Sequence, residues 1–152
     1  MTEIAGEDRA LFSRKIRSAM KTKGLSFRRL AHEVGLSPFI VTAALLGQMQ
    51  LPKVAPTKVA ALLEMPEAED FLIEIPMRGS IGQAVPTDPV IYRFYEIVQV
   101  YGTTLKALIQ EEFGDGIMSA IDFDLDLTRQ PDPNGDRVRI VMTGKFLKYK
   151  KD

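Results

Sequence analysis

Apolar residues return at helical spacing near the start of the chain. Between Asp8 and Lys21 they recur about every third or fourth position among basic side chains, namely Leu11, Phe12, Ile16, Ala19 and Met20. This spacing gathers them on one helix face, and Gly24 ends the run. The pattern predicts an amphipathic first helix.

Two serines mark the starts of the next two helices. Ser26 precedes FRRLAHEV, which ends at Gly35, and Ser37 precedes PFIVTAALLG. A serine hydroxyl at an N-cap accepts a backbone N–H of the first turn, and a glycine readily ends a helix. Helix, glycine turn and helix together predict a helix-turn-helix arrangement.

Prolines divide the following residues into short elements and then a boundary. We expect short helices over 56–65 and 66–75, each begun by a proline. Residues 76–89 hold three prolines and two glycines, which predicts a linker loop. The expected organisation is a helical bundle over 1–75, this linker, and a second domain over 90–152.

Two consecutive helices are expected after the linker. An apolar stripe runs through DPVIYRFYEIVQV, Gly102 interrupts it, and TTLKALIQEEF resumes behind a threonine cap until Gly114. Glycines at these positions are typical of a helix break and of a helix end.

The tail changes to a period of two, which is typical of strands. Apolar residues alternate with aspartates over 121–127 and with arginines from 137 to 142, and PDPNGD between them supplies a turn. We expect the aspartates to form a solvated face opposite Arg137 and Arg139. The predicted fold class is mainly α with a small β part (α+β). Because an isolated two-stranded hairpin is marginal in water, hairpins of two subunits should pair or interlock.

Composition narrows the chemistry that the chain can perform. Its 152 residues include no cysteine, which excludes disulfides, iron–sulfur clusters and thiol nucleophiles, and one histidine, His32. We expect His32 at the surface without a role, and no metal site. MTEIAGEDRALF lacks the features of a signal peptide, and no later run approaches the roughly 20 apolar residues of a membrane span. We therefore expect a cytoplasmic protein with no membrane contact.

Charge is divided unevenly, although the formal net charge is zero. Residues 1–60 carry ten basic against four acidic residues, and residues 61–152 carry ten against sixteen. A basic helix-turn-helix raises an alternative function, a transcription regulator with a C-terminal dimerisation domain. The second helix of that motif reads bases through Arg, Lys, Asn or Gln side chains. PFIVTAALLG offers only Thr42 as a polar side chain, so we expect a structural motif and no nucleic acid partner.

Arg93 and Glu96 form the most suggestive pair of charged residues. Their i, i+3 spacing places both on one helix face, beside Tyr92 and Tyr95. Most exposed pairs at this spacing are surface ion pairs worth about 0–1 kcal/mol. Spacing alone therefore does not assign them a function.

The run PTDPVIYRFYEIVQVYGTTLKALIQEEFGDGIMSAIDF closely resembles the signature region of the cyanase family, also called cyanate hydratases or cyanate lyases. PMRGSI before it and GKFLKYK after it also resemble that family, as does LSFRRLAHEVGLSPFIVTAALLGQ near the start. The resemblance implies a lyase that uses bicarbonate to decompose cyanate to ammonia and carbon dioxide through carbamate.

The resemblance also implies the site and the assembly. The family's catalytic arginine, glutamate and serine fall on Arg93 and Glu96 in YRFYE and on Ser119 in GIMSAI. The family uses no metal or organic cofactor, and bicarbonate is a recycled co-substrate. Its helix-turn-helix bundle does not bind DNA, and five interlocked dimers form a decamer. A ring-forming protein without activity is a third hypothesis.

Two anionic reactants set a physical requirement for such a site. Unit charges 4 Å apart repel by about 1 kcal/mol in water and about 4 kcal/mol at an effective dielectric of 20. One guanidinium leaves a dianionic intermediate undercompensated, so we expect Arg93 residues of adjacent subunits to converge. Ser119 should donate a hydrogen bond to developing negative charge, and Glu96 should orient Arg93 or a protonated intermediate.

Overall fold

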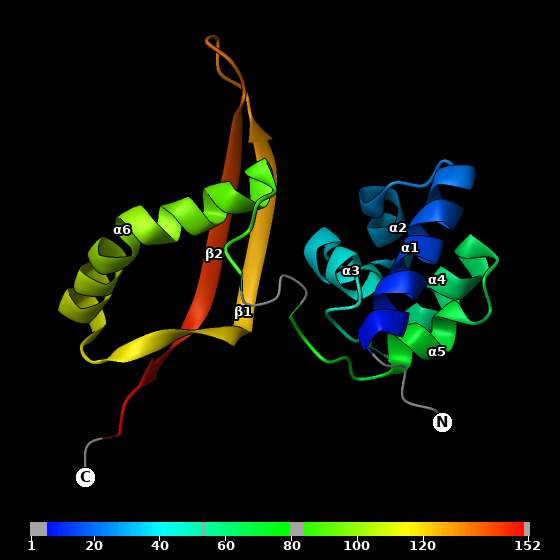
Figure 1. Cartoon of the computed structure of the whole chain (residues 1–152), viewed down its shortest axis with the longest axis horizontal. Coiled ribbons are helices and arrows are strands. Elements are labelled where there is room, and N and C mark those ends of the chain that lie inside the picture. Colours follow the sequence, from blue (N-terminus) through cyan, green and yellow to red (C-terminus); the bar gives the residue numbers. More distant parts are fainter. Residues whose placement is uncertain (1–5, 53, 80–83, 151–152) are drawn as a thin grey trace. The chain divides into compact units, whose positions relative to one another are not determined.

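The chain forms two compact units, Met1–Ser80 and Ile81–Asp152 (Figure 1). The structure is a computed structural model that describes residues 6–52, 54–79 and 84–150. Within these ranges no helix combines the length and the apolar composition needed to cross a membrane. Each unit has its own architecture, helical in the first and mixed in the second.

Five helices build the described part of the first unit: α1 (Gly6–Thr22), α2 (Phe27–Val34), α3 (Pro38–Leu45), α4 (Ala55–Leu63) and α5 (Ala68–Ile73). The expected caps of α2 are confirmed, because the Ser26 side chain accepts the N–H of Arg29 and Gly35 adopts a left-handed φ of 79°. Ser37 caps α3 in the same way, by accepting the N–H of Phe39. The two short helices expected over 56–65 and 66–75 are present but shorter, and neither begins at its proline: α4 begins at Ala55 and α5 at Ala68.

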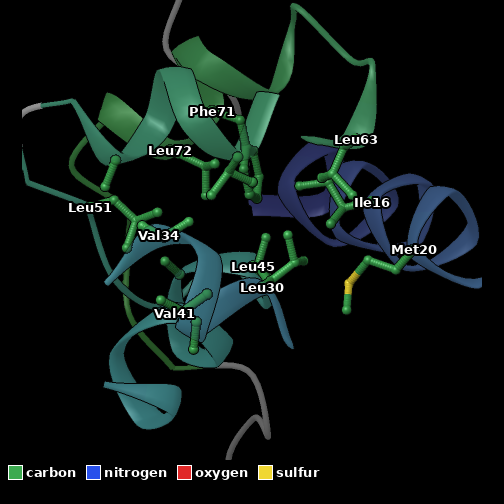
Figure 2. Close-up of a cluster of buried hydrophobic side chains, with 14 residues drawn as sticks. Ile16, Met20, Leu30, Val34, Val41, Leu45, Leu51, Leu63, Phe71 and Leu72 are labelled. Atoms are coloured by element: carbon green, nitrogen blue, oxygen red, sulfur yellow. The ribbon is translucent and has the colours of Figure 1, made fainter. Parts of the chain in front are cut away.

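A continuous apolar core holds these five helices together. Figure 2 shows side chains of α1, α2, α3 and the α4–α5 region pointing toward one another, with Phe71 and Ile16 among them. Both are fully buried, as are Leu30 and Leu45. Burying one such side chain contributes about 1.5–3 kcal/mol to stability. The apolar residues whose spacing predicted the helices are therefore the ones that stabilise the bundle.

Arg9 ties the start of α1 to the end of α5 inside this unit. Its guanidinium lies 2.8 Å from a carboxylate oxygen of Glu74, donates to the carbonyl of Phe71 at 3.2 Å, and lies over the Phe71 ring. Burial lowers the pKa of Arg9, while the charge and hydrogen bond of Glu74 raise it. The pair is largely buried and links the start of α1 to the end of α5.

The expected linker over 76–89 is only partly visible, because residues 80–83 lie outside the described residues. Before this gap, the N–H of Gly79 donates to the side-chain oxygen of Gln48 at 2.8 Å. After it, Asp88 caps the next helix by accepting the N–H groups of Val90 and Ile91.

One continuous helix, α6 (Pro89–Phe113), follows where two were expected. The expectation of a break at Gly102 is wrong. A glycine within a helix costs only about 1 kcal/mol relative to alanine, a cost that a helix of 25 residues tolerates. Gly114, with φ 89°, ends α6 as expected.

The β-hairpin is confirmed as two antiparallel strands, β1 (Gly116–Gln130) and β2 (Arg137–Lys148). In Figure 1 the tip of the hairpin projects beyond α6. The expected pairing of aspartates with arginines is wrong, since Asp124 faces Thr143 and Asp126 faces Val141.

Of the two arginines of β2, Arg137 pairs near the turn instead, and Arg139 faces Thr128. Arg137 lies across from Gln130 and forms an ion pair with Asp132 at 3.0 Å. The N–H of Asn134 and then the Arg137 side chain lower the pKa of Asp132. Arg137 thus stabilises the turn and does not pair with an aspartate of β1.

Candidate active site

Arg93 and Glu96 lie on the first half of α6, on one face as their spacing predicts. Nη1 of Arg93 is 3.9 Å from Oε2 of Glu96, and the two side chains are 65% and 49% exposed. An ion pair this long and this exposed contributes little to stability. The guanidinium fork therefore stays available to bind an anion.

Aromatic side chains surround this pair on the helix. The Arg93 guanidinium lies 5.8 Å from the centre of the Tyr92 ring, and the rings of Tyr92 and Tyr95 are 6.1 Å apart. Gln99 donates from Nε2 to the hydroxyl of Tyr95 at 2.9 Å. The face thus combines one cation, one carboxylate and two phenol rings.

Ser119 has a different environment on β1. It is 5% exposed, and no other residue described over 84–150 is buried. Its Oγ accepts the N–H of Ile121 at 3.0 Å and the N–H of Asp122 at 2.9 Å. A serine oxygen has two acceptor sites and one proton. Both acceptor sites are therefore used, and the proton is left to donate.

These bonds close an irregularity in the hairpin. Met118 pairs with Phe146 and Phe123 pairs with Gly144. Between these two pairs β1 advances by five residues and β2 by only two. The additional residues of β1 fold into a bulge that begins at Ser119. Bulges of this kind redirect a side chain and occur next to functional sites.

The described part of one chain does not join the three predicted residues. Its interactions connect Arg93 to Glu96 and neither of them to Ser119. The helix from Arg93 to Phe113 rises about 1.5 Å per residue, or roughly 30 Å in all. Arg93 and Glu96 lie in the first half of this helix, and Ser119 lies on the strand that follows its other end.

No group of three or more His, Cys, Asp or Glu side chains capable of holding a metal ion occurs in the described ranges. The side chains of the three candidate residues offer anion binding by a guanidinium, hydrogen-bond donation from a hydroxyl, and acceptance by a carboxylate.

Comparison with known protein families covers both units. Residues 9–76 match the family described as cyanate hydratase, N-terminal, and residues 83–151 match the cyanate lyase C-terminal domain. The chain belongs to the cyanate hydratase family. The predicted family is confirmed, and so is the fold class.

Relatives in this family extend over most of the chain. A cyanate hydratase of Ralstonia pickettii is 61% identical over 84% of this chain and 88% of its own length. One from Polynucleobacter asymbioticus is 51% identical over 94% of this chain and 98% of its own length. The crystal structure of cyanase from T. urticae is 37% identical, has a TM-score of 0.80, and matches over 91% of this chain and 97% of that one.

Proposed function

We propose that this lyase of the cyanate hydratase family consumes bicarbonate together with cyanate and releases ammonia and carbon dioxide through carbamate. The observation that supports the activity most strongly is the match of both units to the family's two domains, over residues 9–76 and 83–151. Arg93, Glu96 and Ser119 are the proposed catalytic residues, and bicarbonate is the only co-reactant.

The proposed reaction balances without a cofactor. A bicarbonate oxygen attacks the cyanate carbon, a C–O bond forms, and the nitrogen takes up a proton. Cleavage of the bond between the transferred oxygen and the former bicarbonate carbon releases carbon dioxide, the bicarbonate proton passes to the nitrogen, and carbamate remains. Protonation of carbamate nitrogen then breaks its C–N bond and releases ammonia and a second carbon dioxide. One bicarbonate, one cyanate and two protons thus give one ammonia and two carbon dioxide.

Arg93 supplies the positive charge that two neighbouring anions require. Its planar fork donates two parallel hydrogen bonds to a carboxylate-like group. Because the intermediate is a dianion, we propose that Arg93 residues of adjacent subunits converge on one site. The exposure of this side chain on α6 leaves it accessible to such a partner.

Ser119 and Glu96 complete the proposed site. The Ser119 hydroxyl, whose oxygen already accepts two N–H bonds, donates its proton toward the charge that develops on the attacked group. Glu96 accepts a hydrogen bond from Arg93 or from a protonated intermediate and so orients it.

The second unit supports the proposal of an oligomer. No residue of α6 is buried, and Ile121, at the bulge, is 98% exposed. Exposed apolar surface on this scale marks an interface, and a lone hairpin needs a partner surface. We propose that hairpins interlock into dimers and that five dimers form a decamer, with active sites at subunit interfaces.

Replacement of Ile121 by aspartate tests this assembly. We expect the parent protein to behave as ten chains of 17.0 kDa, about 170 kDa, in light scattering. Ile121→Asp should dissociate it to smaller species, because burying a charge without a partner costs several kcal/mol. The matched control is Val54→Asp, an exposed aliphatic residue of the first unit. A variant that keeps the parent mass would contradict Ile121 as an interface residue.

The first domain, residues 1–75, is proposed to be structural. The helix that would read DNA is α3, and its start presents Phe39 and Ile40, both half-buried. These apolar side chains lack the donors that read base edges. We propose a cytoplasmic enzyme without a nucleic acid partner, and a reducing compartment suits a chain without cysteine.

Ammonia release from cyanate tests the proposed function. The purified protein is assayed in buffer freed of bicarbonate and again after bicarbonate is restored. We expect turnover to stop in the first condition and to return in the second. A protein of the expected mass that releases no ammonia in either condition would overturn the proposal.

A further inference from the structure

Gly144 of β2 lies against the bulge that holds Ser119. A Cβ atom at Gly144 would collide with the carbonyl oxygen of Ser119 and would lie 2.5 Å from Cγ of Met118. Real Cβ atoms are essentially never this close to another atom. The flexible Met118 side chain can move away, but the Ser119 carbonyl belongs to the backbone and moves only with its residue.

The need for glycine here comes from this close approach and not from backbone conformation. Glycines with positive φ in the described ranges include Gly114 and Gly135, and Gly144 is not among them. Any residue could therefore adopt its backbone angles. A glycine inside a strand is typical of a bulge or of close backbone approach, and Gly144 meets both conditions.

Gly144 approaches the backbone of the same residue whose hydroxyl accepts two N–H groups. With its carbonyl packed against Gly144, Ser119 lies where its Oγ accepts the N–H groups of Ile121 and Asp122. Chains of hydrogen bonds polarise one another, so an oxygen that accepts two bonds becomes a better donor. Its single proton then has one direction left.

We propose that Gly144 is a positioning residue for Ser119: by lacking a side chain, it lets the bulge close and hold the serine proton toward the substrate anion. This inference rests on the proposed function and concerns the geometry of that same site. A methyl group at Gly144 displaces the Ser119 backbone, and a displacement of about 1 Å at a reacting group can cost about 100-fold in rate.

A double-mutant cycle on the assembled protein tests this inference. We expect Gly144→Ala to lower kcat by about 10- to 100-fold, with a small change in KM. In the Ser119→Ala background the same substitution should lower kcat no further, because the hydroxyl that it misplaces is already absent. The melting temperature should still fall when the two substitutions are combined, since the collision with the backbone remains.

Gly116→Ala is the matched control in the same hairpin. A Cβ there would collide with the carbonyl of Leu147 and lie 2.5 Å from Cζ of Phe146, away from Ser119. We expect it to lower the melting temperature, while any loss in kcat multiplies with that of Ser119→Ala. Equal non-additivity for both glycines would overturn the assignment to Gly144.

The remaining outcomes separate the inference from the proposed function. No turnover by the parent protein would contradict the proposed function. Full turnover by Ser119→Ala would contradict the proposed catalytic role of Ser119. Full kcat in Gly144→Ala, or a loss that multiplies with Ser119→Ala, would overturn the inference alone. If Gly144→Ala does not assemble, Met118→Ala is added to remove the side-chain part of the collision. Failure of both forms to assemble would assign Gly144 to folding and also overturn it.

Discussion

Arg93→Lys should lower kcat for cyanate by about 100-fold or more, although it keeps the positive charge. Arginine and lysine differ in geometry, because a guanidinium offers a rigid planar fork and an ammonium is a compact point charge. Loss of one preorganised donor to a developing charge costs about 100- to 1,000-fold in kcat. If Arg93 residues of adjacent subunits share one site, each assembled site loses more than one fork.

Steady-state kinetics with cyanate and bicarbonate varied separately measure this effect. Arg29→Lys is the matched control, because Arg29 also forms an exposed pair with a glutamate along one helix, at 2.8 Å from Glu33. We expect the control to keep the kcat of the parent protein. Near-normal turnover by Arg93→Lys at an unchanged oligomer mass would exclude bidentate anion binding by this side chain.

Ser119→Ala should lower kcat by about 100- to 1,000-fold, the usual cost of removing one donor from an oxyanion site. The substitution also removes the acceptor of the N–H groups of Ile121 and Asp122. Each lost hydrogen bond contributes about 0.5–1.5 kcal/mol to stability. We therefore expect a moderate fall in melting temperature together with the large fall in kcat.

A second buried serine separates catalysis from stability. Ser13 is 7% exposed, and its Oγ donates to the carbonyl of Leu45 at 2.7 Å in the first unit. Ser13→Ala should lower the melting temperature and leave kcat unchanged. A Ser119→Ala protein that turns over cyanate at the rate of Ser13→Ala would show that the Ser119 hydroxyl takes no part in the reaction.

Local signals predicted the elements of the first unit well. Ser26 caps the start of α2 and Gly35 caps its end, as predicted. Ile16, one of the regularly spaced apolar residues of α1, is fully buried. Capping and amphipathic spacing depend on residues within one or two turns, so a sequence displays them directly. The prediction of a helix break at Gly102 was wrong because a single glycine costs little within a helix of 25 residues.

Strand register was harder to predict, because it depends on residues far apart in the chain. Alternation identified the hairpin, yet the bulge after Met118 shifts the pairing, and no local pattern announces a bulge. From Phe123 to Gln130 the pairing runs to the turn without a shift, so the turn and not the bulge places Asp124 opposite Thr143. One signal was present in the sequence, a glycine at position 144 inside a strand.

The candidate site was predictable only in part for the same reason. The i, i+3 spacing was enough to place Arg93 and Glu96 on one face, at 3.9 Å. Periodicity gave no indication that Ser119 is buried or that its oxygen accepts two N–H groups, since both follow from the bulge. The family resemblance identified Ser119 as a candidate catalytic residue, and only the structure showed its hydrogen bonds.

The central proposal is that bicarbonate reacts with cyanate at this site, and isotope labelling tests it most directly. The purified protein is given ¹³C-labelled bicarbonate and unlabelled cyanate, and ammonia and both forms of carbon dioxide are followed in the first turnovers. We predict two carbon dioxide per ammonia, one labelled and one unlabelled, and no ammonia when bicarbonate is left out. Ammonia released at the same rate without bicarbonate, or accompanied by unlabelled carbon dioxide alone, would contradict the proposal.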